Sequence, residues 1–231
     1  RKVSDDSVCA VMIDVVQGEG GITPVAPGFL KAVQDLCHKH DALLMLDQVQ
    51  CGMMRTGHLF SHFAEAAVKP DVVTLAKALG GGMPVGAMLV GERAEHTFQF
   101  GSHGSTFGGN PLACAVALEV LKILQSKKLA ANVAARSKQM FSGLKAINTK
   151  MSLFKEVRGR GLMVGAELVP ALAGKAGDIM EHARNYGVLV LQAGPNVLRF
   201  LPPLTISEKE LKEGLKRLDA ALHDFQHTLR G

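Results

Sequence analysis

Three stretches of the chain are apolar runs without polar alternation: Val8–Ile13, Ala42–Leu46 and Val72–Leu75. Such runs are typical of parallel strands whose two faces are both covered. Between the first two, apolar residues recur at spacings of about four, which predicts a helix over Gly28–His40. A helix between two buried strands forms a βαβ unit, so we expect an α/β fold with a mostly parallel sheet.

Each of the three runs leads into polar residues. The first run ends on Asp14 and is followed by Gln17–Gly21, the second ends on Asp47, and the third is followed by Lys77. The carboxyl ends of parallel strands meet at one edge of a sheet, and ligands of open α/β sheets bind at that edge. We therefore expect these polar groups to form a ligand site.

Lys77 is the most informative of these residues. It lies between two alanines, just before the triple glycine Gly80–Gly82. Desolvation lowers the pKa of a lysine, and a neutral amine can form a Schiff base with an aldehyde. Asp47 could hold the ring nitrogen of a pyridine aldehyde protonated, so that the ring withdraws electrons from a substrate carbanion. A solvated lysine at a strand end is equally compatible with this stretch alone.

A second candidate feature is the loop of residues 101–110, which holds four glycines together with Ser105 and Thr106. Hydroxyl groups in a glycine-rich loop suit an oxyanion such as phosphate. A loop with no ligand is the alternative interpretation. Asn110 and Pro111 predict the N-cap and first position of a helix that runs to about Gln125.

Beyond Ser126 the composition changes to a polar helix and short strands, which places a domain boundary near residue 126. We expect residues 1–126 to belong to a large domain and residues 127–231 to form a small α+β domain. Ser207 and Glu210 have the spacing of a capping box that opens the last helix.

Arg199 precedes Phe200–Pro203 in the expected small domain. Its guanidinium could hold a carboxylate with two parallel hydrogen bonds, which a lysine cannot do. An ordinary salt bridge is the competing interpretation.

Five segments, spread over nearly the whole chain, together resemble the class III, fold type I, pyridoxal-phosphate aminotransferases. The resemblance is greatest to the acetylornithine/succinylornithine branch, and the order of the segments is that of the family. The segments are Gln17–Gly21, Asp47–Gln50 with Arg55–Gly57, Ala76–Gly82, His103–Pro111 and Arg199–Pro203. The chain departs from the family pattern in two places. Asp14-Val15 stands where the family usually has Glu-Pro, and Gln48 stands where it usually has Glu.

The resemblance implies a fold, a cofactor and a site. The fold is that of the pyridoxal-phosphate-dependent transferases (fold type I), and the chain resembles the C-terminal portion of such an enzyme. Its large-domain sheet is then incomplete at the N-terminus. Lys77 and Asp47 would be catalytic, with pyridoxal 5'-phosphate as cofactor. The cofactor-binding residues would be Lys77, Asp47, Gln48, Val49, Gln50 and Thr106. Thr106 would reach the phosphate of the partner subunit, so a homodimer with a shared active site is expected.

The resemblance also implies transamination of N-acetylornithine, or of succinylornithine, with 2-oxoglutarate, which gives the semialdehyde and glutamate in arginine metabolism. The substrate-binding residues would be Glu19, Ser105 and Arg199, with Glu19 pairing with Arg199 or facing the distal amine. Another ω-amino acid or ornithine transaminase, an aminomutase or a decarboxylase would keep Lys77 and Asp47. A non-catalytic dimerising fragment remains an alternative from a different class.

Composition limits the classes of partner that we expect. The formal net charge is +5, but the basic residues are scattered, and one tyrosine and no tryptophan are available for base stacking, so we expect no nucleic acid partner. No apolar run is long enough to span a membrane. The histidines His38, His40 and His103 have no second cluster with ligand spacing, so we expect no metal. The four cysteines form no Cys-x-x-Cys pair, which indicates reduced thiols and a cytoplasmic location.

Overall fold

The structure is a computed structural model that describes residues 7–65 and 67–229. The chain divides into two compact units. The described residues of the first unit lie within 1–16, 25–54 and 58–126, and those of the second lie within 17–24, 55–57 and 127–231. Two short segments, 17–24 and 55–57, therefore belong to the second unit although their chain neighbours belong to the first.

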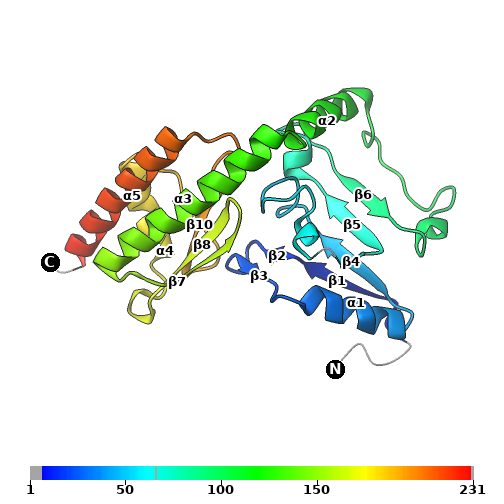
Figure 1. Cartoon of the computed structure of the whole chain (residues 1–231), viewed down its shortest axis with the longest axis horizontal. Coiled ribbons are helices and arrows are strands. Elements are labelled where there is room, and N and C mark those ends of the chain that lie inside the picture. Colours follow the sequence, from blue (N-terminus) through cyan, green and yellow to red (C-terminus); the bar gives the residue numbers. More distant parts are fainter. Residues whose placement is uncertain (1–6, 66, 230–231) are drawn as a thin grey trace. The chain divides into compact units, whose positions relative to one another are not determined.

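The first unit contains a four-stranded sheet in the order β1-β4-β5-β6 (Figure 1). Its strands are β1 (Ala10–Asp14), β4 (Leu43–Asp47), β5 (Val72–Leu75) and β6 (Ala87–Val90). β1, β4 and β5 are mutually parallel, and β6 is antiparallel to β5. The predicted mostly parallel α/β sheet is confirmed, and the three apolar runs form its three parallel strands.

Helix α1 (Phe29–Lys39) connects β1 and β4, as the periodicity predicts. Its buried residues include Leu30 and Cys37. The connection from β4 to β5 holds only a short 3₁₀ helix, η1 (Ser61–Ala64).

The two faces of this sheet are covered unequally. In β4, Leu44 and Leu46 are buried whereas Leu43 and Met45 are half-buried, and Met12 of β1 is 55% exposed. The expectation that both faces are covered is therefore met at β5, where Val72 and Val73 are both buried, and only in part at β4 and β1.

After β6 come η3 (Glu95–Thr97) and helix α2 (Pro111–Leu124). Asn110 caps α2, because its Oδ1 accepts a hydrogen bond of 2.9 Å from the Ala113 N–H. The predicted cap and the proline at the first helical position are both confirmed.

The second unit contains an antiparallel sheet in the order β7-β8-β10-β9. Its elements are α3 (Lys127–Met151), β7 (Phe154–Arg160), β8 (Met163–Leu168), η4 (Pro170–Leu172), α4 (Ala176–Asn185), β9 (Leu191–Gln192), β10 (Val197–Phe200) and α5 (Glu208–Thr228). β7 and β8 pair as an antiparallel hairpin, which agrees with the short strands expected in this part of the chain. The capping box of Ser207 and Glu210 is confirmed by both of its hydrogen bonds.

One face of this second sheet forms the core of the unit. Leu144 of α3, Ile179 of α4 and Leu222 of α5 pack with Val164 and Leu198 of the strands, and all five are fully buried. The opposite face carries the side chains of alternate strand positions, among them Arg158 and Arg199. Strands β2 (Val16–Gln17) and β3 (Thr23–Pro24) form a separate two-stranded ribbon.

Candidate active site

A row of polar residues crosses the carboxyl edge of the first sheet. Asp14 of β1 is in register with Asp47 of β4, and Asp47 is in register with Thr74 of β5. Paired residues of neighbouring strands share one face of a sheet, so the three side chains lie side by side. The side-chain oxygen of Thr74 is buried and has no hydrogen-bond partner within the described residues.

The charges at this edge interact. Although Asp14 is exposed, desolvation raises the pKa of its carboxyl, the Asp47 carboxylate raises it further, and the Lys77 ammonium lowers it. Asp14, Asp47 and Lys77 thus form one electrostatic cluster. The sequence placed Asp14 at the expected ligand-binding edge and among the departures from the family pattern, but assigned it no chemical role.

The Asp47 carboxylate is held in a defined position. Its Oδ1 accepts a hydrogen bond of 2.9 Å from the backbone N–H of Val49, and the residue is half-buried. Two residues further, the Gln50 side chain has a buried Oε1 with no hydrogen-bond partner within the described residues. Because buried polar atoms are normally satisfied, this oxygen is a sign of a missing partner.

Gln48 has a different environment from its neighbours. It is fully buried. Its Oε1 accepts a hydrogen bond of 2.5 Å from the Ser61 N–H, and its Nε2 lies 2.6 Å from His62 Nδ1. Burial lowers the pKa of His62 to about 4, so the neutral ring accepts through Nδ1 from the amide. The Gln48 side chain, a predicted cofactor contact, therefore joins β4 to η1 inside the first unit.

Lys77 follows β5 directly and opens the 3₁₀ helix η2 (Lys77–Leu79). Its φ of 46° is in the left-handed region, which costs a non-glycine residue free energy and concentrates at functional positions. Its side chain is exposed in this chain. Position 80, three residues after Lys77, must be a glycine, because a Cβ there would lie 1.9 Å from the Met83 carbonyl oxygen. The strand end and glycine turn thus hold the lysine backbone in a strained but fixed conformation.

The two candidate hydroxyls, Ser105 and Thr106, lie exposed in the loop before α2. Ser105 Oγ accepts a hydrogen bond of 2.9 Å from the Gly108 N–H, which closes a tight turn. The structure therefore presents both residues on the surface of the first unit.

The second unit holds two of the predicted substrate-binding residues, Arg199 and Glu19. Arg199 of β10 forms an ion pair through Nη1 with Glu19, which lies in the segment 17–24 of the same unit. The Arg199 side chain is only 11% exposed whereas that of Glu19 is 75% exposed. Arg199 Nε is buried and has no partner within the described residues. One donor of the guanidinium is thus unsatisfied, while another is engaged by Glu19.

Arg55 is a residue of the family motif to which the sequence gave no role. Its Nη1 donates to the carbonyl oxygens of Leu162, at 3.1 Å, and Pro202, at 2.6 Å. The Leu162 N–H in turn donates a hydrogen bond of 2.9 Å to the Arg55 carbonyl oxygen. Burial lowers the pKa of the Arg55 guanidinium to about 10. Pro202 lies three residues after Arg199, so Arg55 fixes the backbone at the end of the arginine strand.

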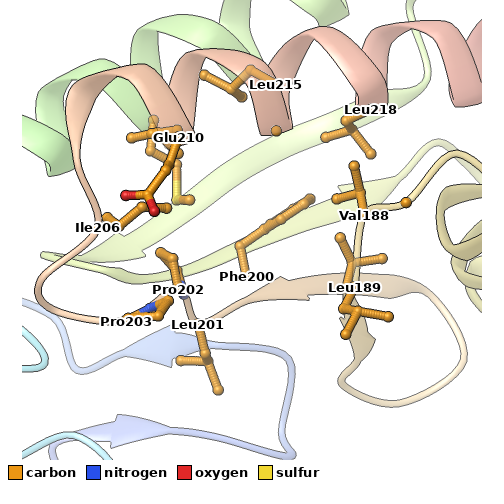
Figure 2. A pocket seen from close by; sticks show the side chains of 15 residues that line it. Val188, Leu189, Phe200, Leu201, Pro202, Pro203, Ile206, Glu210, Leu215 and Leu218 are labelled. Carbon is orange, nitrogen blue, oxygen red and sulfur yellow. The ribbon is translucent and has the colours of Figure 1, made fainter.

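A pocket of about 400 Å³ lies elsewhere in the second unit, between α5 and the extended segments around Val188 and Leu201. Figure 2 shows that its labelled side chains are mostly apolar, with Glu210 at one side. The Glu210 carboxylate accepts a hydrogen bond of 2.8 Å from the Ser207 N–H. Since this carboxylate already serves the helix cap, the pocket offers no reactive group.

The polar groups of the first unit fit a pyridine aldehyde with a phenolic oxygen. They include a fixed carboxylate on Asp47, an amine on Lys77, and unsatisfied side-chain oxygens on Gln50 and Thr74. Among the described residues, no group of His, Cys, Asp and Glu side chains could hold a metal ion. No described helix is long and apolar enough to cross a membrane.

Comparison with known proteins agrees with this chemistry. The family model of class III aminotransferases matches residues 1–222. Acetylornithine aminotransferase of Xanthomonas campestris pv. campestris is 56% identical over 220 residues, which are 95% of this chain and 54% of that protein. The chain therefore spans about half the length of this relative.

Two solved structures share the fold. The crystal structure of N-acetylornithine aminotransferase from Stenotrophomonas maltophilia K279a matches with a TM-score of 0.90 and 52% identity, over 96% of this chain and 58% of that one. Ornithine aminotransferase of Toxoplasma gondii, described with partial occupancy of PLP at its active site, matches with a TM-score of 0.92 and 33% identity, over 100% of this chain and 54% of that one.

The chain belongs to the class III aminotransferase family. The expected fold, that of the fold type I aminotransferases, is confirmed by these structural matches.

Proposed function

We propose that the protein is a pyridoxal 5'-phosphate-dependent transaminase that moves the terminal amino group of N-acetylornithine, or of succinylornithine, to 2-oxoglutarate. The products are the semialdehyde and glutamate. The observation that carries the proposal is the strained Lys77, which shares one sheet edge with the fixed Asp47 carboxylate. The similarity to an acetylornithine aminotransferase at 56% identity supports the choice of substrate.

Asp47, Val49, Gln50 and Lys77 would hold the cofactor in the first unit. Asp47 would keep the ring nitrogen protonated, Val49 would pack against the ring, and Gln50 would hydrogen-bond to the ring oxygen. When bound, pyridoxal phosphate supplies an electron-withdrawing ring that stabilises negative charge on the substrate carbon. The Lys77 amine would hold the cofactor covalently and then carry the proton between the substrate carbon and the cofactor carbon.

The exposure of Thr106 supports a role outside its own subunit. We assign it to the cofactor phosphate of a second copy, so that the working protein is a homodimer with shared sites. Ser105 in the same loop would contact substrate. The four cysteines have no Cys-x-x-Cys spacing, which favours a reducing compartment, and we place the protein in the cytoplasm.

Arg199 would hold the α-carboxylate of each substrate, since Nε is unsatisfied and Nη1 is engaged only by an exposed glutamate. Two unlike substrates can share one arginine if Glu19 neutralises it when no carboxylate is bound. Arginine suits this task because its planar fork matches a carboxylate.

A panel of amino donors tests this function in a polypeptide of the relatives' full length. With 2-oxoglutarate as acceptor, N-acetylornithine or succinylornithine should be converted faster than free ornithine or a simple ω-amino acid. The 33% identity to an ornithine aminotransferase makes ornithine the second candidate donor. If ornithine were the faster donor by kcat/KM, the proposed specificity would be wrong. If the protein bound no pyridoxal phosphate, the alternative of a non-catalytic protein would be supported.

A further inference from the structure

The segment 17–24, which carries Glu19, lies on the sheet of the second unit in an ordered way. Gly165 of β8 is in register with Arg158 of β7 on one side and with Arg199 of β10 on the other. The three residues thus form a row on one face of the sheet, with a glycine between two arginines.

Ile22 occupies the space that Gly165 leaves. Ile22 is fully buried, and a Cβ added to Gly165 would lie 2.8 Å from the Ile22 Cβ. Ile22 also has a φ of 53°, in the left-handed region, so its backbone conformation depends on the surrounding contacts. The missing side chain at 165 is therefore what lets the segment lie directly on the sheet.

The two arginines contact different parts of this segment. Arg158 Nε donates a hydrogen bond of 3.0 Å to the Gly21 carbonyl oxygen, whereas Arg199 pairs with the Glu19 carboxylate. Arg158 is itself fixed by Glu156, at 2.9 Å, and by Glu167. Because Gly21 is two residues from Glu19, the Arg158 hydrogen bond holds the backbone that presents the glutamate.

We propose that Arg158 is a positioning residue that, with Ile22 seated over Gly165, places Glu19 against Arg199 as an internal competitor of the substrate carboxylate. This rests on the proposed role of Arg199. The Glu19 side chain is 75% exposed and can swing into solvent, whereas that of Arg199 is 11% exposed and stays in place. An incoming carboxylate therefore replaces Glu19 on a guanidinium that is already oriented.

Glutarate binding to the cofactor-loaded, full-length protein tests the proposal, because glutarate has the two carboxylates of 2-oxoglutarate and no keto group. Glu19→Gln removes the competitor, so glutarate should bind about three- to fivefold more tightly, as expected for loss of a partly exposed ion pair. Arg158→Gln should tighten binding by about two- to threefold. In the Glu19→Gln background the same Arg158 substitution should have no further effect.

Two further variants separate positioning from folding. Gly165→Ala should reproduce the Arg158→Gln effect without any change of charge, because the added Cβ displaces Ile22. Arg158→Lys provides a milder change if Arg158→Gln does not fold. Lys155→Gln is the matched control. Lys155 bridges the same Glu167, at 2.9 Å, but among the described residues it forms no hydrogen bond or ion pair with the segment 17–24. The Lys155→Gln variant should bind glutarate as tightly as the parent.

The proposal is overturned if Arg158→Gln leaves glutarate affinity unchanged, or if its effect persists in full when Glu19 is already Gln. Failure of the underlying function gives a different result. In that case Arg199→Gln would bind glutarate as tightly as the parent, and both assignments would be wrong.

Discussion

His62 should make the first unit sensitive to acid. Burial lowers the pKa of this histidine from an ordinary 6.5 to about 4. A histidine whose folded pKa is lowered opposes protonation in the folded state, so the unfolded state binds more protons below pH 6.5. Stability is therefore complete above about pH 6.5 and falls as the pH drops toward 4.

The shift sets the size of the effect. A difference of about 2.5 pKa units corresponds to roughly 3 kcal/mol, of which about 2 kcal/mol is lost by pH 5. The structural reason is that His62 Nδ1 accepts from Gln48 Nε2 at 2.6 Å, and protonation turns this acceptor into a donor. Gln48 would then have to turn its amide, which would remove its Oε1 from the Ser61 N–H.

His62→Phe removes the group that titrates. The variant leaves the Gln48 amide without its acceptor, which costs about 1–3 kcal/mol at every pH. Its free energy of unfolding should be lower than that of the parent at pH 7. Between pH 7 and 5 the parent should lose about 2 kcal/mol more than the variant, as measured by urea unfolding of the full-length protein at each pH. His58→Asn, on an exposed histidine of the same segment, is the control and should keep the parental pH dependence. If the free energy of unfolding fell equally with pH in the parent and in His62→Phe, the reasoning would be refuted.

Two further substitutions test the chemistry of the proposed site in the full-length protein. Asp47→Ala should still bind pyridoxal phosphate but lower kcat by at least about 100-fold, and an unchanged rate would mean that another group protonates the ring. Arg199→Lys should weaken N-acetylornithine and 2-oxoglutarate alike by about ten- to a hundredfold and affect a simple amine without a carboxylate little. Equal losses for all three, with a lower melting temperature, would show a structural role.

Most of the framework could be predicted because it depends on local signals. The apolar runs that end at Asp14, Asp47 and Leu75 form parallel strands, and the caps at Asn110 and Ser207 form the expected hydrogen bonds. Parallel strands bring their carboxyl ends together, so Asp47 and Lys77 could be placed at one edge without coordinates.

What the sequence could not show are partners far apart along the chain. Arg158 and Gly21 are separated by 137 positions, and Arg55 and Pro202 by 147. Neither pair belongs to a local pattern, so sequence reasoning named none of these contacts. The Gln48–His62 pair was missed for another reason: in sequence, Gln48 stands between two expected cofactor contacts, and only its burial shows that its amide faces inward.

We propose that the cofactor is attached to Lys77. Borohydride reduction of the full-length protein loaded with pyridoxal phosphate, followed by peptide mass mapping, tests it directly. Reduction makes the bond between an amine and the cofactor permanent, so a single modified peptide containing Lys77 is expected. Lys77→Ala should give no modified peptide and no transamination. Modification at another lysine, or retained activity in Lys77→Ala, would contradict the account.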